Sequence, residues 1–290
     1  MDGVVLASPE HYKIRYVINP LTNTNSTVDP TKAIEQFNKL KGRLESNHIP
    51  VHVIDSKIAD PEGKYPDLVY VSNSALILKG WPTKVAILAR YAHPERRGEE
   101  ERVGAYLKHI LGYKVISLPD REGLYFEGDT RWSNNGKDLW MCYGTGRTTL
   151  AGIEAVREAI MGEATLNSWP PPTIHVLKMI GRITCQLGLC FLPLPNGRVL
   201  LHCTSFSPGS NKIIVNHFGK KNCVSLPLKY LYACNSVYLD EHSLLIPKLP
   251  GCRQWMYAVT SMKIIEVNVE QFHMAGGSVA CMVLPLWSLV

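Results

Sequence analysis

The chain has 290 residues, of which 46% are hydrophobic and 19% are charged. This length is enough to bury a full hydrophobic core, and the composition contains no block of the kind that stays disordered. The formal net charge is +6, and the lysines and arginines are scattered apart from short pairs such as Arg96-Arg97. Because a nucleic-acid surface needs a concentrated basic stripe, we expect no nucleic-acid partner.

The N-terminus and the apolar runs indicate neither secretion nor membrane insertion. Asp2 stands where a secretory signal needs positive charge, and no run approaches the roughly 18 apolar residues of a membrane span. The eight cysteines lie mostly in apolar stretches and lack the spacing of a zinc site, which is typical of reduced core residues. We therefore expect a cytoplasmic or mitochondrial-matrix protein with no metal and no cofactor.

Short apolar runs of strand type alternate along the chain with segments of helical period. Strands are predicted at residues 3–7, 51–54, 68–78, 85–89, 114–118, 139–143, 174–179, 183–192, 199–203, 222–226, 237–239, 244–247, 263–267 and 279–286, and helices at 30–46, 95–111, 148–161, 209–218 and 252–261. These elements make about five units of roughly 40–60 residues, a period that indicates a propeller or array. Units this small cannot bury both faces alone, so we predict one α/β domain over residues 1–290 whose units close around a shared centre.

Several short segments carry a resemblance to known enzymes. In chain order they are Tyr16-Val17-Ile18-Asn19-Pro20, residues 65–75, residues 89–100, Tyr125-Phe126-Glu127-Gly128-Asp129, residues 143–149, Ser205-Phe206-Ser207-Pro208, Cys234-Asn235-Ser236-Val237 and residues 275–286. Together they resemble the guanidino-group-modifying enzymes, closest to the arginine dihydrolases and the dimethylarginine dimethylaminohydrolases, over nearly the whole chain. The resemblance implies the pentein fold, a five-bladed αβ-propeller of pseudo-five-fold ββαβ units around a central channel.

The chemistry of that family explains why such residues are needed. A guanidinium is planar, charged and forked, so an enzyme holds it with carboxylates that accept paired hydrogen bonds. The resemblance further implies a cysteine thiolate that attacks the central carbon. A histidine then protonates the leaving amine and activates the water that follows.

Carried over residue by residue, the resemblance makes Cys281, on a predicted terminal strand, the nucleophile and Asp129 the first guanidinium-binding acid. The other residues that match positions lining the substrate pocket are Asp67, Asn73, Arg90 and Arg147. Each also has an ordinary structural interpretation, since such a cysteine commonly packs in a core, Asp and Asn form turns or caps, and Arg is commonly solvated. We expect Cys281 to face a central channel also lined by Asp129 and Gln186.

The chain differs from the family at the two positions where the family has its catalytic histidine and its second acid. Alignment on residues 192–200 places the histidine position on Gln186 and the acid position on Gly188. The nearest other histidines do not fit, because His175 lies too far upstream and His202 a full strand later. The segment that ends in Asp129 is also shorter than the family's, which would retract Asp129 from the channel.

These losses affect the same chemical step. Loss of a general acid or base costs typically 10²–10⁴-fold in rate, and loss of one of two acids leaves a bound guanidinium under-compensated. We therefore expect an inactive member of this enzyme class, used as a structural or regulatory subunit with protein partners in a larger assembly, with room for an arginine-like ligand. The alternative is an active cysteine hydrolase that acts through Cys281 on arginine or a methylated arginine, with a misaligned Gln186 or another base.

Overall fold

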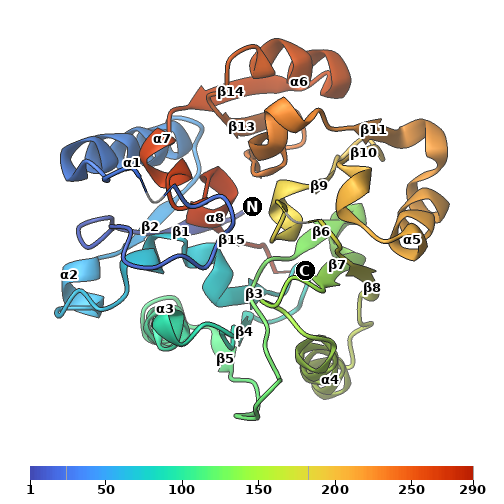
Figure 1. Cartoon of the computed structure of the whole chain (residues 1–290). Coiled ribbons are helices and arrows are strands. Elements are labelled where there is room, and N and C mark those ends of the chain that lie inside the picture. Colours follow the sequence, from blue (N-terminus) through green and yellow to red (C-terminus); the bar gives the residue numbers. More distant parts are fainter. Residues whose placement is uncertain (24, 182, 290) are drawn as a thin grey trace. The chain divides into compact units, whose positions relative to one another are not determined.

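The structure is a computed structural model that describes residues 1–23, 25–181 and 183–289. The chain, drawn in Figure 1, divides into two compact units. Unit 1 comprises Met1–Ser72 and Leu226–Leu286, and unit 2 comprises Asn73–Ser225 with the residues from Trp287 onward. The single domain over residues 1–290 stays a prediction. Within the described ranges, none of the helices combines the length and the apolar character that crossing a membrane requires.

Unit 1 contains two three-stranded sheets with the strand orders β15-β1-β2 and β12-β13-β14. Its elements are β1 (Gly3–Ala7), α1 (Pro30–Glu45), β2 (Val51–Ile54), α2 (Ser56–Ala59), β12 (Val237–Tyr238), β13 (Ser243–Pro247), α6 (Cys252–Thr260), β14 (Lys263–Val267), α7 (Glu270–His273), α8 (Val279–Met282) and β15 (Leu284–Leu286). In both sheets the central strand is antiparallel to one neighbour and parallel to the other. Strand β1 pairs with β15, with Gly3 opposite Leu286, so segments from the two ends of the chain share one sheet.

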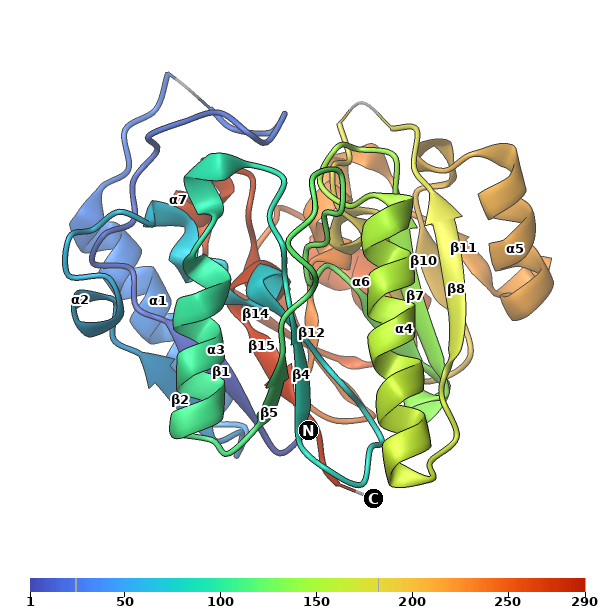
Figure 2. The ribbon, with the colours of Figure 1, turned by 90° about the horizontal axis from the view of Figure 1, so that it is seen from below.

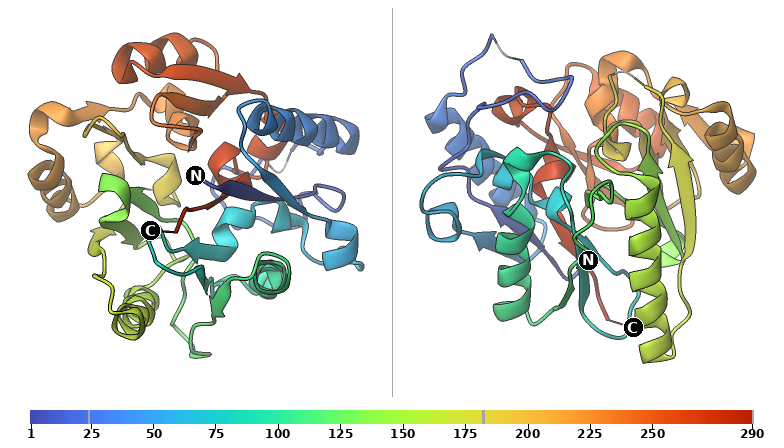
Figure 3. Two further views of the ribbon diagram at one scale, coloured as in Figure 1. Left: turned by 180° about the vertical axis from the view of Figure 1, so that it is seen from behind. Right: turned by 60° about the horizontal axis from the view of Figure 1, so that its bottom comes forward.

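Helix α1 shows how the sequence builds unit 1. The Asp29 side chain caps its first turn by accepting hydrogen bonds from the N–H groups of Thr31 and Lys32, and Pro30 occupies the first helical position. Apolar residues recur along it with helical spacing, so one face is buried in a core that also holds residues of β1 and Phe272 of α7. The blue helix α1 and the red helix α7 lie side by side in both views of Figure 3.

Unit 2 contains three further three-stranded sheets, with the orders β3-β4-β5, β6-β7-β8 and β11-β10-β9. Its elements are β3 (Ala75–Ile77), β4 (Val85–Leu88), α3 (Glu99–His109), β5 (Lys114–Ile116), β6 (Arg131–Ser133), β7 (Asp138–Tyr143), α4 (Leu150–Asn167), β8 (Thr173–Lys178), β9 (Phe191–Pro193), β10 (Val199–Leu201), α5 (Pro208–Phe218) and β11 (Cys223–Ser225). Each sheet is an antiparallel hairpin followed by a helix and a parallel strand, so the chain repeats a ββαβ pattern.

The two faces of strand β7 bury different cores. Leu139 and Met141 pack with the apolar stripe of α4, which runs alongside β7 and β8 in Figure 2. Trp140 and Cys142 face the opposite way, into a cluster that includes Ile214 and Phe218 of α5. This alternation follows from the period of two along a strand, and it places Asp138, the first residue of β7, on the α5 side.

Three predicted strands are partly wrong. The predicted strand 68–78 overlaps the 3₁₀ turns Pro66–Val69 and Val71–Ser74 and includes the short strand β3. The predicted strand 183–192 contains the 3₁₀ turn Leu187–Leu189 before β9. Residues 279–286 contain helix α8 before β15. In each case a continuous apolar run fits a buried helical turn as well as a strand, so periodicity alone does not distinguish them. Strand β6 is too short and polar to have been predicted.

Candidate active site

Cys281 lies in unit 1 on the short helix α8, so the prediction that it lies on the terminal strand is wrong. The residue is 5% exposed, and Asn235 holds it from two directions. The Asn235 Nδ2 donates to the sulfur at 3.2 Å, and the Asn235 Oδ1 accepts the Cys281 N–H at 3.2 Å. The Ser72 hydroxyl donates to the Cys281 carbonyl oxygen at 2.9 Å. An N–H directed at the sulfur is the type of contact that stabilises negative charge there.

The glycine pair before Cys281 is required by the packing. Gly276 has a φ of +80°, which L side chains rarely adopt, and a Cβ there would overlap the Asn19 side chain. A Cβ at Gly277 would overlap the Tyr70 ring. Asn19 is fixed in this approach because its Nδ2 donates to the Gly276 carbonyl oxygen at 3.2 Å. The turn that leads into α8 is therefore fitted closely to residues from the first part of the chain.

Asp67 belongs to the same surroundings in unit 1. It is 9% exposed and lies in a 3₁₀ turn that leads to Tyr70. The Tyr70 hydroxyl donates to the Phe272 carbonyl oxygen at 2.8 Å and lies 2.9 Å from the Tyr12 hydroxyl. Burial raises the pKa of Tyr70 well above its usual value, and the charges of Asp67 and Cys281 act in the same direction. The charges of Asp67 and Cys281 thus both act on the Tyr70 hydroxyl in unit 1.

His273 is a residue of unit 1 that the sequence interpretation did not consider. Its Nε2 lies 3.0 Å from the Ser278 hydroxyl, and its ring stacks on Tyr232 with centroids 4.2 Å apart. Burial lowers the pKa of His273 from 6.5 to about 4, so the imidazole is neutral at neutral pH. Ser278 also accepts the N–H of Cys281 through its carbonyl oxygen at 3.0 Å. Ser278 therefore forms hydrogen bonds with both His273 and Cys281, and it links the histidine to the cysteine in this unit.

Unit 2 brings Asp129 to the segment of Gln186 and Gly188. One carboxylate oxygen of Asp129 accepts the N–H of Gly188 at 3.0 Å, and the other accepts the N–H of Leu187. Gln186 is 4% exposed and precedes this 3₁₀ turn. Burial raises the pKa of Asp129, and the charge of Arg131 and these two hydrogen bonds oppose the rise. Both oxygens of the acid matched to the family's first guanidinium-binding carboxylate are therefore engaged within the chain.

The space beside Gly188 is filled by a guanidinium of the protein itself. A Cβ built at Gly188 would overlap Arg131 Nη2 and would lie 3.2 Å from Asp129 Oδ1. The Arg131 Nη1 donates to the Thr130 carbonyl oxygen at 3.0 Å, whereas its buried Nε has no hydrogen-bond partner among the described residues. At the position matched to the family's second acid, the chain thus has no side chain and places Arg131 there instead.

Arg147, predicted to line the pocket, forms a buried ion pair. Its Nε lies 2.9 Å from each carboxylate oxygen of Glu127, and Nη1 donates to Cys185 Sγ at 3.7 Å. The side chains of Arg147 and Glu127 are 6% and 1% exposed. The charge of Glu127 raises the pKa of Arg147 although burial acts against it. Glu127 lies in the motif of residues 125–129, but the motif alone predicts no role for it. The sequence feature that marks it is its position directly before Gly128.

Asn73 and Arg90 are held by the neighbouring segments of unit 2. The Asn73 Oδ1 accepts from Arg96 Nη1 at 3.4 Å, and Arg96 in turn forms a fully buried ion pair with Glu99. The Arg90 guanidinium pairs with Asp120 at 2.5 Å, and the Arg90 backbone bridges to Phe126. Six of the predicted site residues therefore lie in unit 2 and two in unit 1, and the shared channel of Cys281, Asp129 and Gln186 stays a prediction.

The chain resembles characterised proteins along nearly all of its length. It is 28% identical over 290 residues to the bifunctional arginine dihydrolase/ornithine cyclodeaminase AgrE of Nostoc sp., which covers 97% of this chain and 37% of that protein. The chain therefore spans little more than a third of that relative. It is 23% identical over 273 residues to the N(G),N(G)-dimethylarginine dimethylaminohydrolase of Pseudomonas aeruginosa, with coverage of 93% and 95%.

The fold matches solved structures of the same group. The N-terminal domain of ArgZ, an arginine dihydrolase from cyanobacteria solved with bound substrate, superposes with a TM-score of 0.80 at 24% identity and covers 98% of both chains. This match shows that the chain has a mixed α/β fold of the pentein type. The family model for eukaryotic N,N dimethylarginine dimethylhydrolase matches residues 16–166, more than half of the sequence. The chain therefore belongs to the N,N dimethylarginine dimethylhydrolase family.

Proposed function

We propose that this chain retains the fold of its family without hydrolysing arginine or methylated arginines, and that it serves as a structural or regulatory subunit of a larger assembly. The observation that supports this most directly is the environment of Asp129 and Gly188. Both Asp129 oxygens accept backbone N–H groups, and Arg131 occupies the place of a side chain at position 188. An external guanidinium would have to displace Arg131 and compete with those hydrogen bonds.

The missing histidine adds a second obstacle. Gln186 is an amide at the position matched to the family's catalytic histidine, so it can neither protonate a leaving amine nor carry positive charge beside a thiolate. General acid–base catalysis contributes typically 10²–10⁴-fold. Since the second acid is also absent, both substrate binding and the chemical step lose a group, and turnover is expected to fall below detection.

The arrangement proposed for the sheets is the five-bladed propeller of the pentein fold. The five three-stranded sheets of the described chain share one pattern, in which the central strand has an antiparallel and a parallel neighbour. Repeats of this size stabilise one another by packing against neighbours. An experimental structure in which the sheets do not form a closed ring would contradict this arrangement.

A second candidate function is supported by the surroundings of Cys281. The cysteine keeps an amide N–H donor to its sulfur and a buried position, and the acid Asp67 lies in the same unit. His273, which is neutral at neutral pH, lies in the same unit. In this alternative the chain is a cysteine-dependent hydrolase of arginine or a methylated arginine that has recruited another base.

One assay separates the two candidates. Arginine and N(G),N(G)-dimethylarginine are incubated with the purified chain and with Cys281→Ala, and the loss of each substrate is followed by mass spectrometry. The Pseudomonas aeruginosa relative serves as the positive control with dimethylarginine. We expect the chain and Cys281→Ala to be indistinguishable. Turnover by the chain that disappears in Cys281→Ala would overturn the main proposal and support the alternative.

The proposed assembly and compartment have their own test. We propose that the chain works in the cytoplasm or the mitochondrial matrix, where its cysteines stay reduced; burial of Cys142 and Cys185 raises the pKa of both thiols. Native size-exclusion of extracts from the source cells should place the chain well above its 32.4 kDa mass. Elution of all of the protein at monomer size would count against a subunit role.

A further inference from the structure

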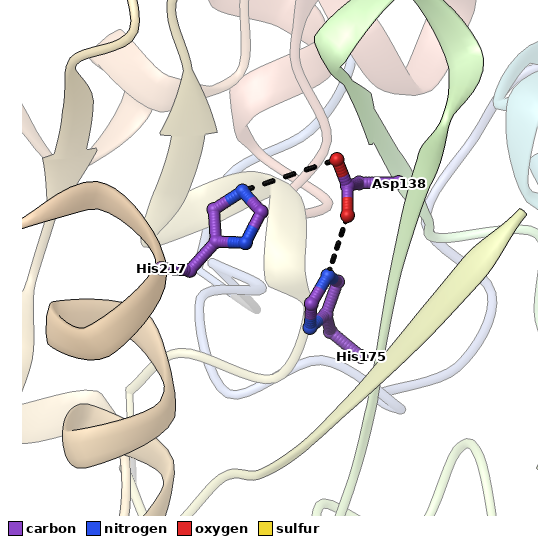
Figure 4. Close-up of side chains that lie close together, drawn as sticks. All are labelled: Asp138, His175 and His217. Atoms are coloured by element: carbon purple, nitrogen blue, oxygen red, sulfur yellow. Dashed lines mark hydrogen bonds and ion pairs between the residues drawn. The ribbon is translucent and has the colours of Figure 1, made fainter.

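One carboxylate and two imidazoles meet in unit 2 on the face of the β6-β7-β8 sheet that helix α5 packs against (Figure 4). Asp138 is the first residue of β7, His175 lies on the neighbouring strand β8, and His217 lies in the last turn of α5. The three residues are distant in sequence, and none belongs to the segments that carry the family resemblance. The pairing of β7 with β8 and the packing of α5 bring them together.

The two oxygens of the carboxylate face different imidazoles. The His175 Nε2 lies 2.7 Å from Asp138 Oδ1, and the His217 Nε2 lies 3.9 Å from Asp138 Oδ2. One ligand atom from each of the three residues can be chosen so that all lie within 4.8 Å of one another. The donors therefore converge on one small volume, and each residue can offer an atom to the same ion.

An aromatic wall fixes the two rings. His175 stacks on Trp140 with centroids 4.0 Å apart and an interplanar angle of 14°, and His217 meets the Trp140 edge at 5.0 Å. Phe218 packs against His217 at 4.7 Å. Apolar walls of this kind hold ligand rings in place and limit access of water, as in the outer shells of metal sites.

Burial decreases from the acid to the outer histidine. The side chains of Asp138, His175 and His217 are 7%, 16% and 28% exposed. Among the described residues, the ion-pair partners of the Asp138 carboxylate are the two imidazoles, and no lysine or arginine pairs with it. Buried charges in proteins are generally paired or coordinate metals. His217 is the most exposed of the three residues, so it is the ligand that an ion from solvent would meet first.

We propose that Asp138, His175 and His217 form a binding site for a divalent transition-metal ion, with Zn²⁺ as the representative. Imidazole nitrogen and carboxylate oxygen are ligands that Zn²⁺ accepts at about 2.0–2.2 Å, which in a tetrahedron places two ligand atoms about 3.4 Å apart. The two observed separations, 2.7 and 3.9 Å, lie on either side of that value. Binding breaks the hydrogen bond between Asp138 and His175, whose proton leaves to solvent, draws His217 inward, and leaves the fourth position open to water or another ligand.

The test uses the full chain after treatment with a chelator, which is then removed by dialysis. Zn²⁺ alone is titrated by calorimetry into the wild type, Asp138→Asn, His175→Gln and His217→Gln. The matched control is His109→Gln, because His109 is also an exposed histidine in the last turn of a helix, α3. We expect one equivalent to bind to the wild type and to His109→Gln, and affinity to fall by about tenfold or more in each of the other variants.

Cobalt distinguishes this site from the cysteines. The Co²⁺ form should show visible bands of nitrogen and oxygen coordination without a thiolate charge-transfer band, and NMR should place the paramagnetic effects on His175 and His217. This measurement needs no variant, so a misfolded Asp138→Asn would leave the proposal testable. The proposal is overturned if the wild type binds no stoichiometric Zn²⁺, if His217→Gln binds as the wild type does, or if Co²⁺ shows thiolate coordination. Any of these results would leave a purely structural Asp138–His175 hydrogen bond.

Discussion

The carboxylate of Asp129 and the backbone N–H of Gly188 are joined by a 3.0 Å hydrogen bond, and the second oxygen of the same carboxylate holds the N–H of Leu187. The family resemblance assigns Asp129 to substrate binding, but in this structure its carboxylate holds the 3₁₀ turn Leu187–Leu189. Arg131 lies beside the pair, and its positive charge opposes the rise in the pKa of Asp129 that burial causes.

Replacement of Asp129 by Ala should therefore destabilise unit 2. The change leaves two N–H groups without their acceptor and removes the opposite charge from Arg131, at a cost of about 2–4 kcal/mol. The free energy of unfolding is measured by urea titration. Asp120→Ala is the control, because Asp120 is 93% exposed and solvent screens its charge, although its partner Arg90 is 19% exposed. Equal effects of the two substitutions would show that Asp129 has no organising role.

The glycine pair before Cys281 gives a second prediction. Gly277→Ala should lower the free energy of unfolding by about 1–3 kcal/mol or more, because its Cβ overlaps the Tyr70 ring. Gly42→Ala is the matched control: this exposed glycine in α1 has nothing within 4 Å of a Cβ. It should stabilise by about 0.5–1 kcal/mol. Thermal unfolding of both variants checks the opposite signs, and a stabilised Gly277→Ala would contradict the packing described at Tyr70.

The buried pair of Glu127 and Arg147 gives a third prediction. Glu127→Gln leaves the guanidinium of Arg147 buried without a counter-charge, and breaking a buried pair in this way costs about 3–5 kcal/mol. Adding Arg147→Met to Glu127→Gln should recover part of that loss, since the unpaired charge is removed. A double-mutant cycle of unfolding free energies measures the coupling. Additive single effects would mean that the two side chains do not depend on each other.

The dependence of stability on pH should report His273. Its folded-state pKa of about 4 lies below its usual value of 6.5, so the unfolded chain binds more protons between these two values. The stability associated with the neutral ring is present above pH 6.5 and is lost as the pH falls to 4, by about 3 kcal/mol in total. His273→Gln should flatten this part of the profile, whereas His109→Gln should not. An unchanged slope in His273→Gln would show that the ring is not held neutral by burial.

Much of the fold could be predicted from the sequence because most elements have a clear period. The strands at residues 3–7, 51–54 and 263–267 have the predicted bounds, and the helices predicted at 30–46 and 252–261 end within one residue of α1 and α6. The predicted strands that are partly wrong fall in apolar runs, where helical turns and strands look alike, whereas β6 is missed because it is short and polar. Helix α8, which carries Cys281, is one of these.

Site residues that lie in a sequence motif could be predicted from the sequence. Site residues that come together from distant segments could not. The sequence motifs predict that Asp129 lies near Gln186 and Gly188. In the structure, Asp129 accepts a hydrogen bond from the N–H of Gly188. Arg131 carries no motif, and its role depends on where β6 directs the side chain. The grouping of Asp138, His175 and His217 depends on strand register and on the packing of α5, neither of which leaves a local signal.

The place of Arg131 decides what a restored site would do. Gln186→His with Gly188→Asp returns the family's residue types, but the new carboxylate would lie against Arg131 and would be neutralised by it. The double variant alone is therefore expected to bind no external guanidinium. Adding Arg131→Met removes the internal guanidinium while keeping an unbranched side chain, so Asp129 and the new acid would then lack the Arg131 counter-charge.

Methylguanidine is the probe for this prediction, and binding is followed by NMR chemical-shift changes in unit 2. The triple variant should show saturable binding at millimolar concentrations, because two carboxylates can then share one forked cation. The wild type and the double variant should show none, and Arg131→Met alone should bind weakly through Asp129. Saturable binding by the wild type would show that Arg131 does not occupy the guanidinium position. A folded triple variant that binds nothing would show that positions 186 and 188 are not the family's catalytic positions.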